Sequence, residues 1–245
     1  MAERVTSTAE KRRAAVLFTG GKDSTLSLMR GLEAGLDVVV LITMKPLNPE
    51  SWMFHYPCVD LTVHQAEALG IPMVQSVTRG EKEAELEDLA VTLKKARREH
   101  AFDVLISGAI ASQYQKHRID SLCNRLSLES QTPLWNSDPE ALLHELLSRR
   151  FEVVFTAVAA QGFTSEWLGR TLDLEAIREL RVLHEKYGVH MALEGGEGET
   201  FVLDCPLFCK RIQLKDVRNV WRGDAGYIEV GGVELLPKHQ PHRES

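Results

Sequence analysis

Residues 18–25 read Phe-Thr-Gly-Gly-Lys-Asp-Ser-Thr and directly follow an apolar run, Ala14–Leu17. An apolar strand that ends in a Gly-Gly turn and continues as a helix builds an anion site. The glycines let the backbone approach a ligand, and the free N–H groups at the helix start point at it. Lys22 adds a cation and Ser24 a hydroxyl at the same place. Asp23 adds negative charge, which fits a residue that positions the helix start or contacts a metal on the phosphates.

Two better-known phosphate motifs do not fit this loop. A Walker A loop needs a glycine, four spacers and then Gly-Lys-Ser/Thr, but Lys22 is followed by Asp23 and position 16 is a valine. A Gly-x-Gly-x-x-Gly dinucleotide fingerprint is also absent from this stretch. The loop resembles the Ser-Gly-Gly-x-Asp-Ser loop of the N-type ATP pyrophosphatases (the PP-loop superfamily), with Thr19 keeping the hydroxyl of the first serine. A Gly-rich turn that binds no ligand is the alternative.

The first half of the chain alternates short apolar runs with amphipathic stretches. This pattern predicts a Rossmann-like (HUP-type) α/β fold, in which a parallel sheet has helices on both faces. Ligands of such sheets bind at the carboxyl ends of the strands, so the turn at Gly20-Gly21 and the turn at Ser107-Gly108 should face one nucleotide. The expected strands are 14–19, 38–44, 73–77 and 104–106, and the expected helices are 24–34, 60–69 and 81–100.

The second half changes character after about Gln131, which predicts an ATP-binding domain over residues 1–130 and a smaller α/β substrate domain over 131–245. Helices are expected at 138–149, with Asp138 as its cap, and at 172–187, closed by Gly188. A strand is expected at 151–158. Short β segments at 209–214, 217–221 and 227–230 then form a hairpin, whose exposed edges make a homodimer conceivable.

Composition narrows the classes of function. The chain has 245 residues, 44% hydrophobic and 26% charged, with a net charge of −6. An acidic chain is not expected to bind nucleic acid stably or to adhere to membranes. Four scattered cysteines predict buried, reduced thiols rather than a zinc site. The polar first residues and the lack of a long apolar run predict a cytoplasmic protein.

A second candidate segment runs from Ser107 to Arg118, after the fourth expected strand. Gly108 permits close backbone approach, and residues spaced three apart share roughly one helix face. Arg118 is suited to bidentate contact with a phosphate. A helix with a solvated polar face is the alternative. The candidate ligand contacts in this segment are Ser107, Gly108, Ala109, Ser112, Gln115 and Arg118.

A third segment places three carboxylates on a glycine-rich loop, and its residues are Glu194, Gly195, Gly196, Glu197, Gly198, Glu199 and Thr200. Three carboxylates within six residues are costly to hold together unless a metal, an ammonium or an imidazolium group joins them. The apolar strand that follows favours a loop held at a rigid edge. A solvated acidic turn is the alternative.

In this order, the three segments resemble the diphthine–ammonia ligase family. The Glu-Gly-Gly-Glu-x-Glu-Thr loop is its narrow signature, and the resemblance covers about Val16 to Lys210. Further matching stretches are 51–55, 65–72, 133–135, 167–170 and 204–208. Two positions depart from the family pattern: Gly198 stands where the family often has Phe, and Leu193 replaces a glycine.

The resemblance implies an ATP-dependent ligase with Mg²⁺. It would adenylate the carboxylate of diphthine, a modified histidine on translation elongation factor 2, and amidate it with ammonia to give diphthamide, AMP and pyrophosphate. ATP would contact Thr19, Gly20, Gly21, Lys22, Asp23, Ser24 and Thr25 together with Ser107, Gly108, Ala109, Ser112 and Gln115.

The resemblance also implies the roles of the charged residues. Lys22 and Arg118 would neutralise the α-phosphate, and Asp23 would hold Mg²⁺. His55, Glu194, Gly195, Gly196, Glu197, Glu199 and Thr200 would meet the substrate or ammonium, and Glu197 and Glu199 would act in catalysis. Free ammonium is the simpler nitrogen source. Two alternatives stay open: a pyrophosphatase-loop enzyme with another carboxyl or carbonyl acceptor, including a tRNA base or a small metabolite, and a nucleotide sensor without turnover.

Overall fold

The computed structural model describes residues 11–47, 58–78 and 84–238. Its first half is a five-stranded parallel sheet in the order β3-β2-β1-β4-β5. The strands are β1 Arg13–Leu17, β2 Asp37–Pro46, β3 Met73–Thr78, β4 Val104–Ile106 and β5 Glu129–Gln131. The predicted Rossmann-like α/β class is therefore confirmed. The strand order reverses between β1 and β4, which is where ligands of such sheets bind.

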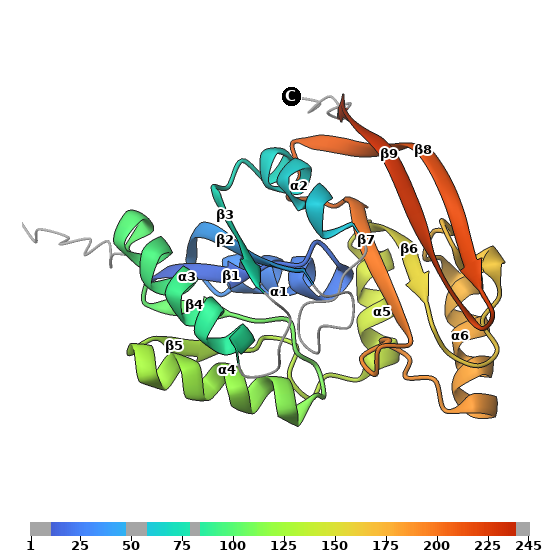
Figure 1. Cartoon of the computed structure of the whole chain (residues 1–245), viewed down its shortest axis with the longest axis horizontal. Helices are drawn as coiled ribbons and strands as arrows, with labels where there is room; N and C mark the ends of the chain where they lie inside the picture. The colour runs from blue at the N-terminus through green and yellow to red at the C-terminus, as the bar shows by residue number, and fades with distance from the viewer. Residues whose placement is uncertain (1–10, 48–57, 79–83, 239–245) are drawn as a thin grey trace, which may run out of the picture.

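Helices cover both faces of this sheet (Figure 1). They are α1 Lys22–Glu33, α2 Thr62–Leu69 (preceded by the 3-10 helix η1 Val59–Leu61), α3 Ala84–His100 and α4 Gln113–Leu126. Alternate residues of β1 face opposite sides: Val16 packs with Leu28 of α1, and Ala15 packs with Leu93 of α3. This arrangement follows from the period of two in a strand and from right-handed crossovers that change side after β3.

The second half forms a four-stranded sheet in the order β7-β6-β9-β8. Its strands are β6 Glu152–Val158, β7 Gly198–Asp204, β8 Lys210–Arg222 and β9 Ala225–Pro237, and all their pairings are antiparallel. Its helices are α5 Pro139–Ser148, the 3-10 helix η2 Ser165–Trp167 and α6 Leu174–Tyr187. Asp138 caps α5 through Ala141 N–H at 2.7 Å, and Gly188 closes α6 in a left-handed conformation, both as predicted.

The short β segments predicted near the C-terminus were wrong in length. Lys210–Arg222 is one continuous strand, and its partner β9 runs on through Gly231 and Gly232 to Pro237. Asp216 lies within β8 with φ of 50°. This local irregularity interrupts the apolar alternation, so the sequence pattern splits a strand that the backbone continues. The short strand β5 was not predicted either.

One of the hydrophobic clusters contains buried residues of both halves. Leu26 and Met29 of α1 pack in the same cluster as Leu143 of α5, Leu180 of α6 and Phe201 of β7. The predicted boundary at 130/131 falls inside β5, before its last residue Gln131, so almost all of the first sheet lies before it. Because buried residues from both sides pack together, the division into two separate domains stays a prediction.

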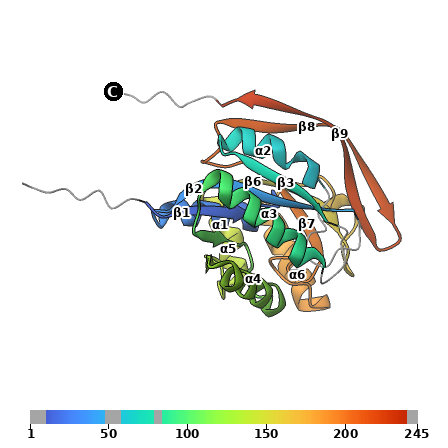
Figure 2. The same cartoon turned by 60° about the vertical axis from the view of Figure 1, so that its left-hand side comes forward.

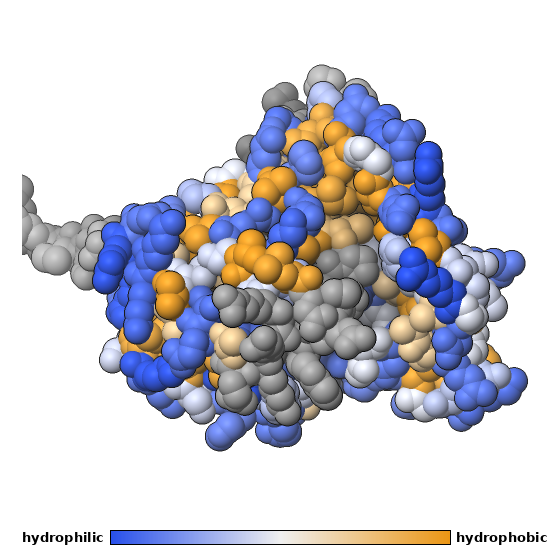
Figure 3. All heavy atoms as spheres, in the orientation of Figure 1, coloured by the Kyte–Doolittle hydropathy of each residue, from blue (hydrophilic) through white to orange (hydrophobic). Residues whose placement is uncertain are grey.

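The β8–β9 hairpin arches beside α2 (Figure 1 and Figure 2). Cys209 N–H donates to the Ala68 carbonyl at 2.6 Å, and Lys210 pairs with Glu67 at 2.8 Å. Figure 3 shows apolar side chains gathered over the same region, between α2 and the hairpin. The expectation of buried thiols holds for Cys123 and Cys205, whereas Cys58 is only partly buried and Cys209 is exposed.

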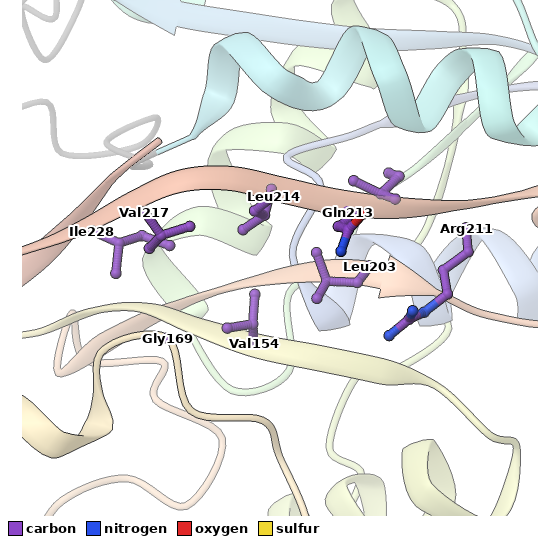
Figure 4. Close-up of a pocket in the computed structure, with 9 residues that line it drawn as sticks. Val154, Gly169, Leu203, Arg211, Gln213, Leu214, Val217 and Ile228 are labelled. Carbon is purple, nitrogen blue, oxygen red and sulfur yellow. The ribbon is translucent and has the colours of Figure 1, made fainter. Parts of the chain in front are cut away.

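A small cavity of about 260 Å³ lies under this hairpin (Figure 4). Apolar side chains of β6 to β9, among them Val154, Leu203 and Leu214, form most of its wall. Its charged lining residue, Arg211, is already paired with Glu152. A wall of this kind offers packing but no unpaired charge for a phosphate.

Candidate active site

The turn between β1 and α1 has the conformation that its glycines predict. Gly20 has φ of +80°, and Gly21 is the N-cap of α1 without a side-chain cap. A Cβ on Gly108 would lie 3.0 Å from the backbone nitrogen of Ser24. The loop after β4 therefore packs directly against the start of α1, and the structure brings together the two turns expected to share one edge.

Hydroxyl groups line this phosphate loop, residues 18–25. Thr19 Oγ1 donates to Ser24 Oγ at 3.2 Å, and Ser24 Oγ donates to the Gly21 carbonyl at 3.1 Å. Thr25 Oγ1 reaches the same carbonyl at 2.9 Å. These hydrogen bonds hold the turn in its conformation.

Lys22 connects the phosphate loop to the segment before Glu194. Its side chain is buried, with the residue only 4% exposed. Its Nζ donates to Asp23 Oδ2 at 2.7 Å and to the Ala192 carbonyl at 2.6 Å. Its backbone N–H donates to Thr200 Oγ1 at 3.2 Å. One residue of the first half thus contacts Ala192, just before the acidic loop, and Thr200, the last residue of this loop, which we define as residues 194–200.

Glu194 and Glu197 are held by backbone donors. The Glu194 carboxylate accepts N–H groups from Ile110 at 3.0 Å, Ala111 at 2.8 Å and Ser112 at 3.2 Å, at the start of α4. Glu197 accepts from the N–H groups of His190 at 3.0 Å and Gly195 at 2.7 Å. The cation that seemed necessary to hold three carboxylates is therefore not needed for these two, because N–H groups and a helix dipole do the same work.

Glu199 lies in a different environment, at the start of β7 opposite Ala157 of β6. Desolvation of its carboxyl group raises the pKa of Glu199 to about 8, although the charge of Lys22 lowers it; the charge of Asp23 raises it further. The pKa of Asp23 is also raised, by desolvation first, against the charge and hydrogen bond of Lys22. Lys22, Asp23 and Glu199 form one coupled group, and perturbed carboxyl groups of this kind are typical of functional sites.

This shift gives a prediction for stability in the absence of ATP and divalent metal. The folded chain keeps the Glu199 proton up to about pH 8, whereas the unfolded chain loses it near 4.5. Its contribution to the free energy of unfolding is thus full below pH 4.5 and falls as pH rises toward 8. Glu199→Gln has no carboxyl group to titrate here. The melting temperature of this variant minus that of the wild type should therefore increase by roughly 5 °C from pH 5 to pH 8.5. A pH-independent difference, measured by calorimetry, would contradict the shifted pKa.

The remaining predicted residues lie in the segment that follows β4 or outside the described residues. Ser107 Oγ is 3.4 Å from Thr132 Oγ1, and Ala109 is buried beside it. The Arg118 guanidinium lies 5.1 Å from the centre of the Tyr114 ring, and its contact with a phosphate stays a prediction. His55 falls outside the described residues.

One placement predicted for α4 is wrong. Ser112 does not share a helix face with Gln115 and Arg118, because the helix begins at Gln113 and Ser112 is its N-cap. The Ser112 hydroxyl accepts the Gln115 N–H at 3.3 Å. A serine three residues before a polar helix residue satisfies the spacing of a face and of a cap equally, and here the cap prevails.

The structure adds residues that the motifs did not identify. His190 Nδ1 accepts the N–H groups of Ala192 at 3.2 Å and Glu194 at 3.5 Å, which shapes the turn that meets Lys22. Gln65 of α2 contacts the phosphate loop from the other side. His190 stands in no local pattern that marks a site. Gln65 begins the 65–72 stretch that resembles the family, but the stretch assigned it no role, and the fold shows what it contacts.

The two departures from the family pattern are complementary in space. Leu193 has φ of 61°, a conformation that favours glycine, and its side chain is buried. A Cβ on Gly198 would lie 3.0 Å from Leu193 Cδ1 and 3.0 Å from the Ala157 carbonyl. The leucine side chain thus occupies space that a larger residue at 198 would need.

A strand order of 3-2-1-4-5, with a Gly-Gly-Lys-Asp-Ser turn at its switch point, defines a nucleotide-binding α/β protein of the PP-loop class. The family models for the diphthamide synthase N-terminal domain and C-terminal domain match residues 12–130 and 138–236. This chain belongs to the diphthine–ammonia ligase family, a family of ATP-dependent amide-forming ligases, as the motifs indicated.

Individual relatives support the same assignment. A diphthine–ammonia ligase of Danio rerio is 35% identical over 244 residues, which cover 91% of this chain and 94% of the relative. The Homo sapiens diphthine–ammonia ligase is 33% identical over 249 residues, with 93% and 92% covered. The one from Schizosaccharomyces pombe is 34% identical over 244 residues, covering 92% of this chain but 40% of the longer relative.

Two features of the described ranges (11–47, 58–78 and 84–238) bear on membrane spans and metal binding. Within them, no helix has the length and apolarity needed to cross a bilayer. No group of three or more His, Cys, Asp or Glu side chains is arranged there to hold a metal. Mg²⁺ bound with ATP needs only one or two carboxylates besides phosphate oxygens and water, and Asp23 at the phosphate loop fits that requirement.

Proposed function

We propose that this chain uses ATP to amidate the carboxylate of diphthine on translation elongation factor 2. The carboxylate oxygen attacks the α-phosphate, pyrophosphate leaves, and an acyl adenylate forms. Ammonia then attacks the acyl carbon, AMP leaves, and the nitrogen loses a proton to become the amide of diphthamide. Membership in the ligase family supports this proposal, and so does the group that Lys22, Asp23 and Glu199 form beside the phosphate loop.

The main support for this proposal is that hydrogen bonds join the phosphate loop to the acidic loop and to the segment before it. Lys22 contacts Asp23 and Ala192 through its side chain and Thr200 through its backbone. A cation at this point stabilises charge that develops on the α-phosphate. Asp23 would hold Mg²⁺, which supplies further charge neutralisation when bound.

We assign different roles to the three glutamates. Glu194 and Glu197 shape the acidic loop through the backbone N–H groups that they accept. Glu199, whose pKa is raised to about 8, is the carboxylate that receives ammonium and takes its proton. A base with a pKa near the working pH is efficient at this step, because it is partly ionised and still accepts a proton well.

The proposal also has consequences for partners and location. The acceptor is the elongation factor bearing diphthine, and free ammonium supplies the nitrogen. An enzyme that modifies this factor works where translation occurs, in the cytoplasm. Homodimer formation through the β8 edge stays a prediction.

Mass spectrometry of the acceptor tests the proposal directly. Elongation factor 2 that carries diphthine is incubated with this chain, ATP, Mg²⁺ and isotopically labelled ammonium. We expect the labelled amide on the modified histidine and AMP in equal amount. AMP formed without a change in the acceptor would favour another carboxyl or carbonyl acceptor, and ATP binding without AMP would favour a sensor.

A further inference from the structure

Gln65 of α2 lies between the two halves of the site. Its side chain is completely buried, at 0% exposure. Its Nε2 donates to the Gly20 carbonyl at 2.8 Å and to the Val202 carbonyl at 2.8 Å. Both neighbours are carbonyl oxygens, so the amide nitrogen must face them. One side chain therefore uses both its N–H groups to join the phosphate loop to β7.

The Gly20 carbonyl accepts a second hydrogen bond in addition to that from Gln65. It also accepts the Val202 N–H at 3.0 Å, so the phosphate loop continues the edge of β7 by a backbone bond. Two residues before Val202, Thr200 accepts the Lys22 N–H. The strand is thus bonded to the loop at two points, and Glu199 precedes the second of them. Any slip of β7 along the loop would move Glu199 away from Lys22.

The fit between Gln65 and Gly20 is close. A Cβ on Gly20 would lie 2.2 Å from Gln65 Oε1 and 3.0 Å from Thr62 Cγ2. The glycine therefore serves the packing of the Gln65 amide in addition to its own φ of +80°. An apolar side chain of the same size fills the space but removes one donor from each carbonyl. The Gly20 carbonyl then keeps only the Val202 N–H, and the loss of these hydrogen bonds costs free energy and lets the loop relax.

We propose that Gln65 is a positioning residue for the ligase reaction: its amide joins Gly20 to Val202 and so holds β7 in register with the phosphate loop. The inference rests on the function proposed above. Gln65 contacts loop backbone rather than the reacting groups, so it acts through the alignment of Glu199 with the phosphate site. Displacement of a reacting group by about 1 Å costs on the order of 100-fold in rate.

The test uses Gln65→Leu and the isosteric Gln65→Glu in the full chain. For Gln65→Leu we expect kcat for amide formation to fall by about 100-fold, with the KM for ATP changed by less than about 3-fold. We also expect more AMP than amide, because a misaligned adenylate is lost to water. Gln65→Glu keeps the shape of the side chain and replaces the donor with an acceptor. It should show the same lowered kcat, nearly unchanged KM for ATP and excess of AMP over amide.

Leu93→Ala is the matched control, since Leu93 is buried in α3, in a hydrophobic cluster that contains no residue of α1, α2 or β7. It should lower the melting temperature while the folded enzyme keeps its ratio of AMP to amide. If both Gln65 variants keep wild-type kcat and equal yields of AMP and amide, Gln65 has no positioning role. A wild-type chain that makes no diphthamide would instead refute the proposed function, so the two failures are distinct.

Discussion

Lys22→Met is expected to lower kcat/KM for ATP, measured as AMP release, by roughly 10²–10³-fold. Methionine keeps much of the length of the side chain but not its charge. Lys22 is buried, so its ammonium acts in a poorly solvated place where a charge has a large effect on the phosphates. Its loss also leaves Asp23 and Glu199 without their cation, which raises the pKa of both carboxyl groups further.

Lys215→Met serves as the control for this substitution. Lys215 pairs with Glu234 on the β8–β9 hairpin at 2.8 Å, away from the phosphate loop. Its loss should leave AMP release within about 2-fold of wild type, because an exposed ion pair contributes little. If Lys22→Met released AMP at the wild-type rate while remaining folded, the phosphate would have to bind elsewhere.

The parts of the fold that could be predicted are those set by local pattern. The apolar run before Gly20 and the strand before Gly108 both end at the same edge, because parallel strands must. Asp138 and Gly188 mark helix ends, since capping chemistry involves neighbouring residues only. Such signals can be read from a single chain without knowledge of its tertiary structure.

The parts that could not be predicted depend on contacts between distant residues. The Glu194 carboxylate bonds to N–H groups 82 to 84 positions away, and Gln65 bridges Gly20 and Val202 across 45 and 137 positions. In sequence, three glutamates on one loop look equivalent. The fold separates them, because two meet backbone donors while Glu199 meets the charges of Lys22 and Asp23.

Hydrogen bonds and apolar packing join the two halves of the chain at the phosphate loop. Lys22 forms hydrogen bonds with Ala192 and Thr200, and Gly20 forms one with Val202 of β7. Side chains of α1 also pack in the hydrophobic cluster of the second half. The phosphate loop is thus supported from both halves. Hydrogen bonds and a shared hydrophobic cluster therefore join the phosphate loop to β7.

Glu199→Gln is expected to lower amide formation by about 100-fold or more while ATP affinity changes by less than about 3-fold. The amide keeps the size of the side chain but cannot take a proton from ammonium, so the acyl adenylate persists until water removes it. AMP release should then exceed amide yield. Steady-state assays of both products, with ATP binding measured by calorimetry, separate the two effects. A parallel loss of ATP binding would place Glu199 at the phosphates instead of the ammonium.

Glu197→Gln is the comparison that the structure makes informative. Glu197 accepts N–H groups from His190 and Gly195, so its amide variant turns an NH₂ group toward one of these donors and loosens the loop. We expect a lower melting temperature and a smaller loss of amide yield than for Glu199→Gln, with AMP and amide still formed in equal amounts. Both substitutions replace one carboxyl group of the same loop with an amide, so a difference in the ratio of amide to AMP reports the particular position of Glu199 beside Lys22. Equal ratios in the two variants would mean that the separate roles assigned to these glutamates are wrong.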